Sequence, residues 1–161
     1  MTVVVEHATA DDAPVISELI EEIEDYYGSR AAPPAAERVE RVRELLFADH
    51  PAARVLLARE GGVTLGIACY SSIWPAVGVT CSLYLKELYV REPGRRKGTA
   101  RLLMEALRQA ARDTGCSRIE WTADRDNPVA LKFYESLGAR AQDGKVFYRV
   151  SVPPGGTGSA G

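Results

Sequence analysis

Hydrophobic positions along the chain follow two periods, one typical of strands and one typical of helices. Residues 3–6 form a short β-branched run, and the polar turn 9–12 that follows offers Thr and Asp side chains as helix N-caps. Behind this turn, apolar residues recur at the 3.6-residue period of a helix that ends at Gly28. These residues are Ile16, Leu19, Ile20, Ile23 and Tyr27. A second helix is expected over about residues 36–48.

The middle of the chain reads as sheet. Two apolar runs, 54–59 and 63–72, flank a Gly-Gly pair at 61–62, which supplies the positive φ that a tight hairpin needs. A loop is expected at 74–75, where Trp precedes Pro. The run 80–90 that follows is long enough to cross the middle of a sheet.

The last third of the chain alternates helix and strand. The pattern predicts a strong amphipathic helix over 98–114, a strand over 117–123, a short helix over 128–137 and a final strand over 145–152. Strand-helix-strand units need crossovers whose helices cover the sheet, so a mixed α/β architecture with a central sheet is expected. Residues 153–161 are too poor in apolar groups to pack, and we predict that they are disordered.

Length, charge and cysteine content narrow the class further. The 161 residues predict one domain over 1–152, and a net charge of -2 without a basic excess argues against nucleic acid as a partner. The chain has no apolar run near the ~20 residues of a membrane helix and no signal-like start, so we expect no membrane partner and a cytoplasmic location. Three widely spaced cysteines, Cys69, Cys81 and Cys116, predict reduced thiols and no bound metal.

The most informative segment is the basic, glycine-containing turn between the long strand and the strong helix. Unpaired backbone N–H groups and the positive end of the helix dipole converge there, and together they attract phosphate. Gly98 and Ala100 leave room for close approach, while Arg95, Arg96 and Lys97 add charge that complements a diphosphate or a 3′-phosphate. The alternative is that the three basic residues only decorate a solvated turn. The motifs of NTP-binding loops and of dinucleotide folds are missing, so those folds fit worse.

Two motifs resemble those of the GNAT acetyltransferases. The run R-x-x-G-x-A from Arg95 to Ala100 resembles the segment by which this family holds the pyrophosphate of acetyl-CoA, although Thr99 replaces a branched aliphatic residue and Ala100 the commoner glycine. The run N-x-x-A-x-x-F-Y-x-x-x-G from Asn127 to Gly138 is similar to the segment that flanks the thioester and pantetheine. The resemblance covers nearly the whole chain and is strongest to spermidine/spermine and thialysine N-acetyltransferases.

The resemblance implies a fold, a donor and an oligomeric state. It implies a mostly antiparallel, twisted central sheet of six to seven strands flanked by about four helices, acetyl-CoA as the acetyl donor, and a homodimer. It also implies a set of residues that contact acetyl-CoA along the strand end, the turn and the later motif. These are Leu88, Tyr89, Val90, Arg95, Arg96, Lys97, Gly98, Thr99, Ala100, Arg101, Asn127 and Tyr134.

Direct acetyl transfer needs an acid for the departing thiolate and a base for the attacking amine. By resemblance, Tyr134 is the general acid, and the alternative is that it only packs the short helix. Asn127 would cap that helix and contact the cofactor, or cap it alone. Glu87 is the candidate base, although Lys86 stands where diamine-type relatives tend to have an acidic residue, and a surface or salt-bridge role is the alternative.

The resemblance favours a small cationic acceptor, namely a polyamine, a diamine or a diamino acid. Acidic and aromatic side chains form the candidate acceptor site, although they fit the wet face of a helix and a core equally well. They are Glu22, Tyr26, Tyr27, Trp74, Tyr84, Trp121 and Asp124. Three alternatives stay open, namely an antibiotic acetyltransferase acting on aminoglycosides, a protein or peptide N-acetyltransferase, and a non-catalytic acetyl-CoA-binding regulator.

Overall fold

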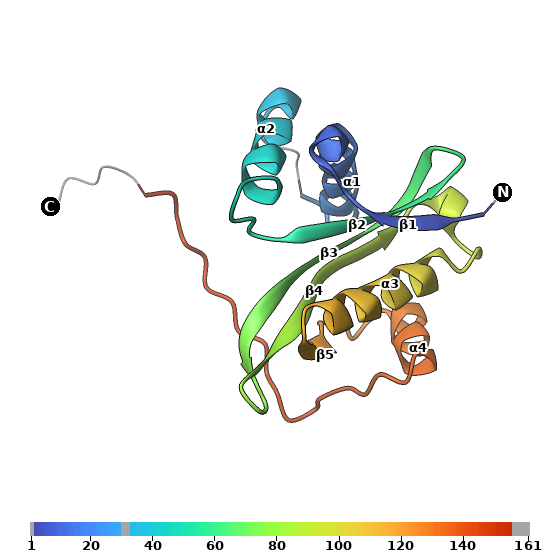
Figure 1. Cartoon of the computed structure of the whole chain (residues 1–161), viewed down its shortest axis with the longest axis vertical. Coiled ribbons are helices and arrows are strands. Elements are labelled where there is room, and N and C mark those ends of the chain that lie inside the picture. Colours follow the sequence, from blue (N-terminus) through green and yellow to red (C-terminus); the bar gives the residue numbers. More distant parts are fainter. Residues whose placement is uncertain (1, 30–32, 156–161) are drawn as a thin grey trace, which may run out of the picture. The chain divides into compact units, whose positions relative to one another are not determined.

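A five-stranded sheet in the order β1-β2-β3-β4-β5 organises the first 122 residues of this computed structural model, which describes residues 2–29 and 33–155 (Figure 1). The chain divides into two compact units, 1–122 and 123–161. The strands are β1 (Val4–His7), β2 (Arg54–Glu60), β3 (Val63–Ala76), β4 (Thr80–Val90) and β5 (Cys116–Glu120). The first three pairings are antiparallel and the last is parallel.

Three helices cover the two faces of this sheet. The helices α1 (Ala13–Tyr26) and α2 (Ala35–Leu46) lie together on one face, and α3 (Thr99–Asp113) lies on the other (Figure 1). Short 3₁₀ turns, η1 (Ala10–Asp12) and η2 (Glu92–Gly94), precede α1 and follow β4. The mixed α/β class is therefore confirmed, with five strands in the described chain rather than six or seven.

The core beneath α1 is built by the apolar stripe that the sequence predicts. Ile16, Leu19 and Ile23 are buried against apolar side chains of the sheet, which include Leu57 and Ile67. Tyr27, predicted on the same stripe, lies beyond the last turn of α1 and is 61% exposed. The stripe therefore ends with the helix itself.

The predicted loop at 74–75 is wrong, because β3 continues to Ala76. The Trp74-Pro75 peptide bond is cis, and the register of β3 against β4 shifts between Ile73 and Ala76. A proline has no N–H to donate to a strand ladder, so it is tolerated in a sheet at such an irregularity. β3 and β4 therefore form one long hairpin whose turn lies at residues 77–79.

The second unit contains α4 (Pro128–Ser136), which matches the predicted short helix. The predicted strand over 145–152 is wrong, because the described part of this unit contains no strand. The large hydrophobic side chains of residues 145–152, among them Phe147 and Tyr148, are 61–87% exposed. An alternating pattern makes a strand only where a second strand pairs with it, and none does here. Residues 153–155 are exposed and irregular, and the rest of the predicted disordered tail, 156–161, lies outside the described residues.

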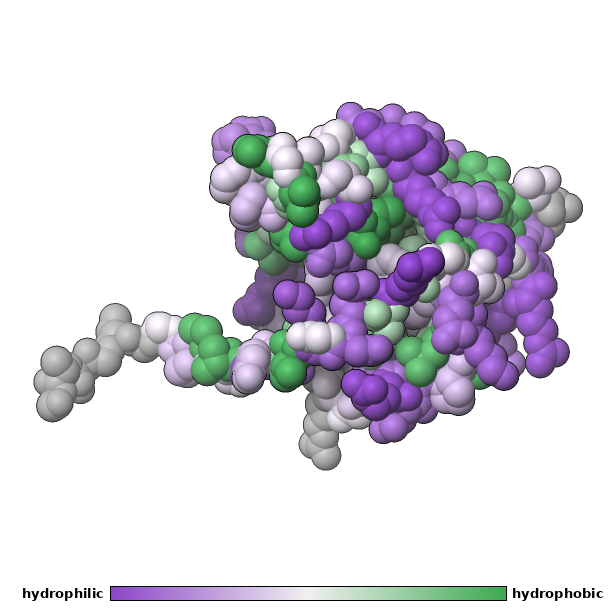
Figure 2. Space-filling model, turned by 90° about the horizontal axis from the view of Figure 1, so that it is seen from below, coloured by the Kyte–Doolittle hydropathy of each residue, from purple (hydrophilic) through white to green (hydrophobic). Residues whose placement is uncertain are grey.

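The surface mixes polar and apolar side chains. On the face shown in Figure 2, hydrophobic residues reach the surface as separate patches among hydrophilic ones. Among the described helices, none combines the length and the apolar character that crossing a bilayer requires.

Candidate functional site

The pairing between β4 and β5 covers only the first part of β4. Its register runs from Cys81 opposite Cys116 to Tyr84 opposite Glu120, where β5 ends. Apart from Lys86, where the register shifts, residues 85–90 of β4 pair with β3 on one side, while no strand in the described chain pairs with them on the other. Unpaired backbone groups of an open strand edge are available to hydrogen-bond a ligand. The strand-end residues expected to contact the cofactor lie on this stretch.

The turn that leaves β4 delivers the chain to the N-terminus of α3. Arg96 and Gly98 have φ values of 65° and 74°, so the backbone bends sharply just before the helix. The first helical hydrogen bond runs from the Leu102 N–H to the Gly98 carbonyl at 3.0 Å. The N–H groups of residues 99–101 come before it and are the orphan donors of the helix. These unpaired N–H donors and the positive end of the helix dipole favour the binding of an anion such as a phosphate.

Two residues close the turn from the inside. The side chain of Thr99 is buried, and its hydroxyl donates to the Gly94 carbonyl at 2.8 Å. A Cβ atom on Gly94 would lie 2.9 Å from Leu65 Cβ and 3.0 Å from Val90 Cγ1, so only glycine fits there without displacement. Thr99, a departure from the usual family residue, thus ties the turn together. The role of Gly94 was missed, because its close neighbour Leu65 is distant in sequence.

The basic residues of the turn differ in what they contact. Arg95, Arg96 and Lys97 are all exposed. The Arg95 Nε donates to the Val90 carbonyl at 3.1 Å, and Lys97 Nζ lies 3.3 Å from a Glu60 carboxylate oxygen. The Lys97 side chain is 46% exposed, so its ammonium group remains accessible to a second anion.

Glu22 is held by two residues at the end of β4. Its carboxylate accepts hydrogen bonds from the Nε and Nη2 groups of Arg91, with Nη2 2.6 Å from Oε2, and another from the Tyr89 hydroxyl at 3.3 Å. The hydrogen bond to Glu22 raises the pKa of Arg91, and burial and Glu22 raise the pKa of the Tyr89 phenol. The pair therefore anchors α1 to the end of β4.

Glu87 projects from the α1 side of the sheet. It is the register partner of Cys69 on β3, and directly opposed residues in an antiparallel pair share a face. Its side chain is 28% exposed, and its carboxylate lies 3.5 Å from Lys86 Nζ. Burial, followed by the charge of Glu87, raises the pKa of the Cys69 thiol to about 12. Cys69 is therefore a neutral neighbour of Glu87 at physiological pH.

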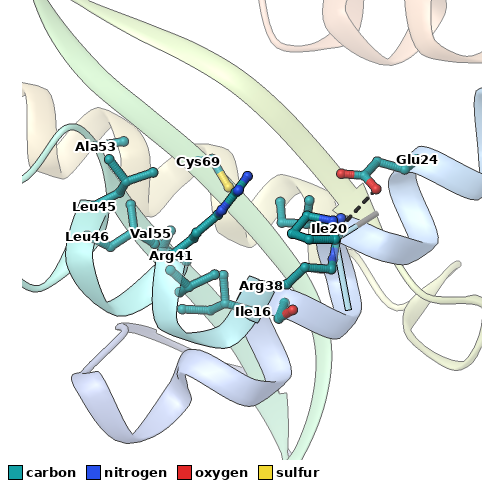
Figure 3. Close-up of a pocket in the computed structure, with 13 residues that line it drawn as sticks. Ile16, Ile20, Glu24, Arg38, Arg41, Leu45, Leu46, Ala53, Val55 and Cys69 are labelled. Atoms are coloured by element: carbon teal, nitrogen blue, oxygen red, sulfur yellow. Dashed lines mark hydrogen bonds and ion pairs between the residues drawn. The ribbon is translucent and has the colours of Figure 1, made fainter. Parts of the chain in front are cut away.

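A cavity of about 390 Å³ lies between α1, α2 and the sheet, and Cys69 is part of its lining (Figure 3). Most of the lining is aliphatic, from Ile16 and Ile20 on α1 and Leu46 on α2 to Val55 on β2. The cavity therefore adjoins the strand pair that carries Glu87.

Three charged side chains also line this cavity. Arg38 is nine-tenths buried and pairs with Glu24 at 3.0 Å, the contact drawn in Figure 3. Arg41 is 59% exposed and pairs with Glu37 at 2.9 Å. Sequence reasoning missed both arginines, although their three-residue spacing places them on one face of a predicted helix.

The predicted acceptor residues lie outside this cavity, because none of them is among its described lining residues. Tyr26 and Tyr27 are largely exposed and pack edge to face on each other. Trp74 is 68% exposed, while Tyr84 and Trp121 are half-buried near the end of the β4–β5 pairing. Asp124 is exposed in the second unit.

The second unit carries the other motif. Asn127 caps α4 by accepting a hydrogen bond from the Ala130 N–H at 3.1 Å on its Oδ1. Tyr134 is half-buried, and its ring centroid lies 5.4 Å from that of Phe133. The predicted roles of Asn127 and Tyr134 toward the cofactor stay predictions. Across both units, the described His, Cys, Asp and Glu residues form no group of three or more that could hold a metal ion.

Comparisons with known proteins agree on one family. A model described as the acetyltransferase (GNAT) family matches residues 16–139. An L-ornithine N5-acetyltransferase of Arabidopsis thaliana is 33% identical over 78 residues, 48% of this chain and 34% of the relative. A thialysine N-epsilon-acetyltransferase of Caenorhabditis elegans is 38% identical over 55 residues, 34% of each chain. The matches thus span about a third of the length of these two relatives.

A further relative and two solved structures match more of their own length. An aminoglycoside N(6')-acetyltransferase type 1 of Salmonella typhimurium is 28% identical over 109 residues, 66% of this chain and 74% of the relative. An integron cassette protein from V. cholerae superposes with a TM-score of 0.83 at 30% identity, covering 94% of both chains. An aminoglycoside N-acetyltransferase in complex with CoA, at 19% identity and a TM-score of 0.76 over 94% of this chain and 96% of its own, shares the fold.

Proposed function

This chain belongs to the GNAT family of acetyltransferases, enzymes whose acetyl donor is acetyl-CoA, and we propose that its acceptor is the side-chain amine of a small diamino acid. The observation that carries this proposal is the mixed lining of the cavity beside Glu87, where aliphatic side chains meet Glu24, Arg38 and Arg41. A cavity of this composition suits a molecule with a methylene chain and charges of both signs.

The donor site we propose follows the geometry of β4 and α3. The pyrophosphate would accept from the N–H groups of residues 99–101, with Arg95, Arg96 and Lys97 supplying charge. The pantetheine arm would pair with the open edge of β4 over Leu88, Tyr89 and Val90, and Arg101 and Asn127 complete the proposed contacts. These features fit the donor because an extended chain with amide groups needs an unpaired strand edge, and a diphosphate needs clustered donors. When bound, acetyl-CoA supplies an activated thioester.

The proton transfers fall to two side chains. An amine attacks only in its neutral form, so a base must accept its proton. We assign this role to Glu87 because its side chain is 28% exposed and its register partner Cys69 lines the cavity. We assign to Tyr134 the donation of a proton to the departing thiolate. Its phenol has the chemistry for this role, and the sequence motif supports its position.

The charges of the cavity favour a diamino acid over a polyamine. The aliphatic lining suits a methylene chain, Arg41 suits an α-carboxylate and Glu24 suits an α-ammonium group. A polyamine would bring only positive charge against two guanidinium groups, a like-charge arrangement that costs affinity. The names of two relatives point the same way, because ornithine and thialysine are both diamino acids.

An aminoglycoside is the second candidate acceptor. It is favoured by the relative of Salmonella typhimurium, of which the match covers 74%. The predicted acceptor residues outside the cavity, which include Trp74, Tyr84 and Trp121, would then matter more, because an aminoglycoside is larger than a diamino acid. The predicted homodimer also stays a prediction, which light scattering on the purified chain would test.

Release of coenzyme A thiol tests the proposal directly. The purified chain is given acetyl-CoA with ornithine, thialysine, 1,4-diaminobutane, spermidine, an aminoglycoside or a short peptide. Saturable release with a diamino acid at the highest kcat/KM supports the proposal, and a higher kcat/KM with another class refutes that acceptor. Acetyl-CoA binding without thiol release from any of these acceptors would favour a non-catalytic regulator.

The general acid is tested in the same assay by Tyr134→Phe. Removing only the hydroxyl should lower kcat by about 100-fold, the lower end of what general acids contribute, because a thiolate is a moderately good leaving group. Binding of acetyl-CoA, measured by calorimetry, should change little. An unchanged kcat would show that Tyr134 only packs the helix.

A further inference from the structure

Two cysteines of neighbouring strands meet at the start of the β4–β5 pairing. Cys81 and Cys116 are register partners, and their Sγ atoms lie 2.6 Å apart although the residues are 35 positions apart in the sequence. Paired strands lie about 4.7–4.9 Å apart, within the roughly 4.4–6.8 Å of Cα separation that a disulfide spans. The backbone therefore already has the spacing that a disulfide between these residues needs.

The surroundings of the two thiols make them chemically unequal. Burial opposes the ionisation of Cys116, but hydrogen bonds from Cys81, Thr114 and Ser72 outweigh it and lower the pKa of this thiol. The Thr114 hydroxyl donates to Cys116 Sγ at 3.5 Å, and Ser72 Oγ lies 3.8 Å away. The pKa of Cys81 is raised, first by its hydrogen bond to Cys116 and then by burial. Cys116 is thus the thiol that ionises first and reacts as the nucleophile.

The third cysteine lies in a different part of the sheet and has no thiol neighbour among its described contacts. Cys69 lies in the cavity lining on β3, and burial and the charge of Glu87 hold its pKa at about 12. The Cys81–Cys116 pair is partly exposed and does not belong to the described lining of that cavity. It lies at the start of β4, whereas the proposed donor contacts lie at the end of the same strand, so the pair is separate from the proposed donor site.

We propose that Cys81 and Cys116 form a redox-active dithiol, which a peroxide converts into an intramolecular disulfide. The Cys116 thiolate attacks one peroxide oxygen, the O–O bond breaks, and a sulfenic acid forms while the released hydroxide takes up a proton as water. The Cys81 sulfur then attacks the sulfenic sulfur, so that the S–S bond forms and the S–O bond breaks. The hydroxyl leaves as a second water with the proton of Cys81. Two thiols thus lose two electrons, and the peroxide accepts them.

The disulfide would cross-link β4 to β5 at the end of their pairing that lies farther from the open edge of β4. The pairing runs only from Cys81 to Tyr84, so the bond would fix one end of a short parallel pairing. A cross-link between residues this far apart in the sequence lowers the conformational entropy of the unfolded chain. The oxidised protein should therefore unfold at a higher temperature than the reduced protein.

Peptide mass spectrometry of the full chain tests the proposal. The protein is treated with an equivalent of hydrogen peroxide, blocked with iodoacetamide and digested without reduction. We expect a linked peptide pair that contains Cys81 and Cys116, loss of two titratable thiols per chain, and full reversal by dithiothreitol. Cys81→Ser and Cys116→Ser should each abolish the link, whereas Cys69→Ser, the matched control, should retain it.

Three results would overturn the proposal. A link that includes Cys69, a disulfide between two chains on a non-reducing gel, or oxidation of Cys116 to a sulfinic acid with Cys81 still free would each be incompatible with it. The assignment of the nucleophile has its own test in the two single variants. Iodoacetamide should modify Cys116 in the Cys81→Ser protein faster than it modifies Cys81 in the Cys116→Ser protein.

Discussion

Replacing Arg41 by Gln should weaken the binding of a diamino acid without weakening that of the matching diamine. Ornithine and 1,4-diaminobutane differ only in the α-carboxylate, so the pair isolates whatever recognises that group. In the proposal this is Arg41, whose present partner Glu37 is 53% exposed. An exposed i,i+4 pair is worth only about 0.3–0.5 kcal/mol, so Arg41 exchanges Glu37 for a substrate carboxylate at little cost.

The size of the effect follows from the exposure of the Arg41 side chain. A hydrogen bond to a charged group contributes about 1.5–3 kcal/mol when it is shielded from water. Because Arg41 is 59% exposed, screening reduces this contribution to about 1 kcal/mol. Since 1.4 kcal/mol corresponds to a factor of ten, KM for ornithine should rise about fivefold. KM for 1,4-diaminobutane should stay the same or fall, because one positive charge has been removed.

Steady-state thiol release with both acceptors gives the measurement, and Arg43→Gln is the matched control. Arg43 lies on the same helix, pairs with Glu40 and does not belong to the described cavity lining. It should change neither KM. Equal effects of Arg41→Gln on the two acceptors, or an unchanged KM for ornithine, would refute the assignment of the carboxylate site.

Three further predictions concern the base, the turn and the buried thiol. Glu87→Gln should lower kcat by about 10²-fold to 10⁴-fold at neutral pH. The loss should become smaller as the pH rises, because the amine is then deprotonated without a base, and a pH–rate profile measures this. A pH–rate profile equal to that of the unmodified protein would show that Glu87 has only a surface role. Gly94→Ala should destabilise the protein by about 1–3 kcal/mol, because the new Cβ would lie 2.9 Å from Leu65 Cβ. Thermal unfolding measures this loss of stability, and an unchanged unfolding temperature would contradict the tight packing of the turn. Cys69 should resist iodoacetamide at pH 8, since its pKa of about 12 leaves almost no thiolate, and rapid labelling of the folded protein would contradict this.

Local patterns in the sequence predicted most of the helices and strands correctly. The strand β4 has the predicted bounds, and the helices α1, α3 and α4 lie within a residue or so of theirs. The turn around Gly98 was also predicted, because a glycine between a strand and an amphipathic helix permits the backbone bend found there. Features of this kind depend on contacts between residues close together in the chain, which the order of residues expresses directly.

The errors arose where an outcome depends on a distant partner. The run 145–152 has the alternation of a strand, but a strand forms only where another backbone pairs with it. Glu22 was predicted in an acceptor site, and only the structure shows that Arg91 and Tyr89, almost seventy residues away, bind its carboxylate. Nothing in the local sequence around Glu22 marks that contact.

The sequence by itself therefore determined the family, the periodic elements and the turn that suits a phosphate, because each depends on neighbouring residues. Only the tertiary structure decided which side chains share a space. It showed the unpaired edge of β4 beyond Tyr84, the cavity between α1, α2 and the sheet, and the contact between Cys81 and Cys116. These features arise when the sheet brings together segments that lie far apart in the chain, and the register that does so depends on the packing of the whole core.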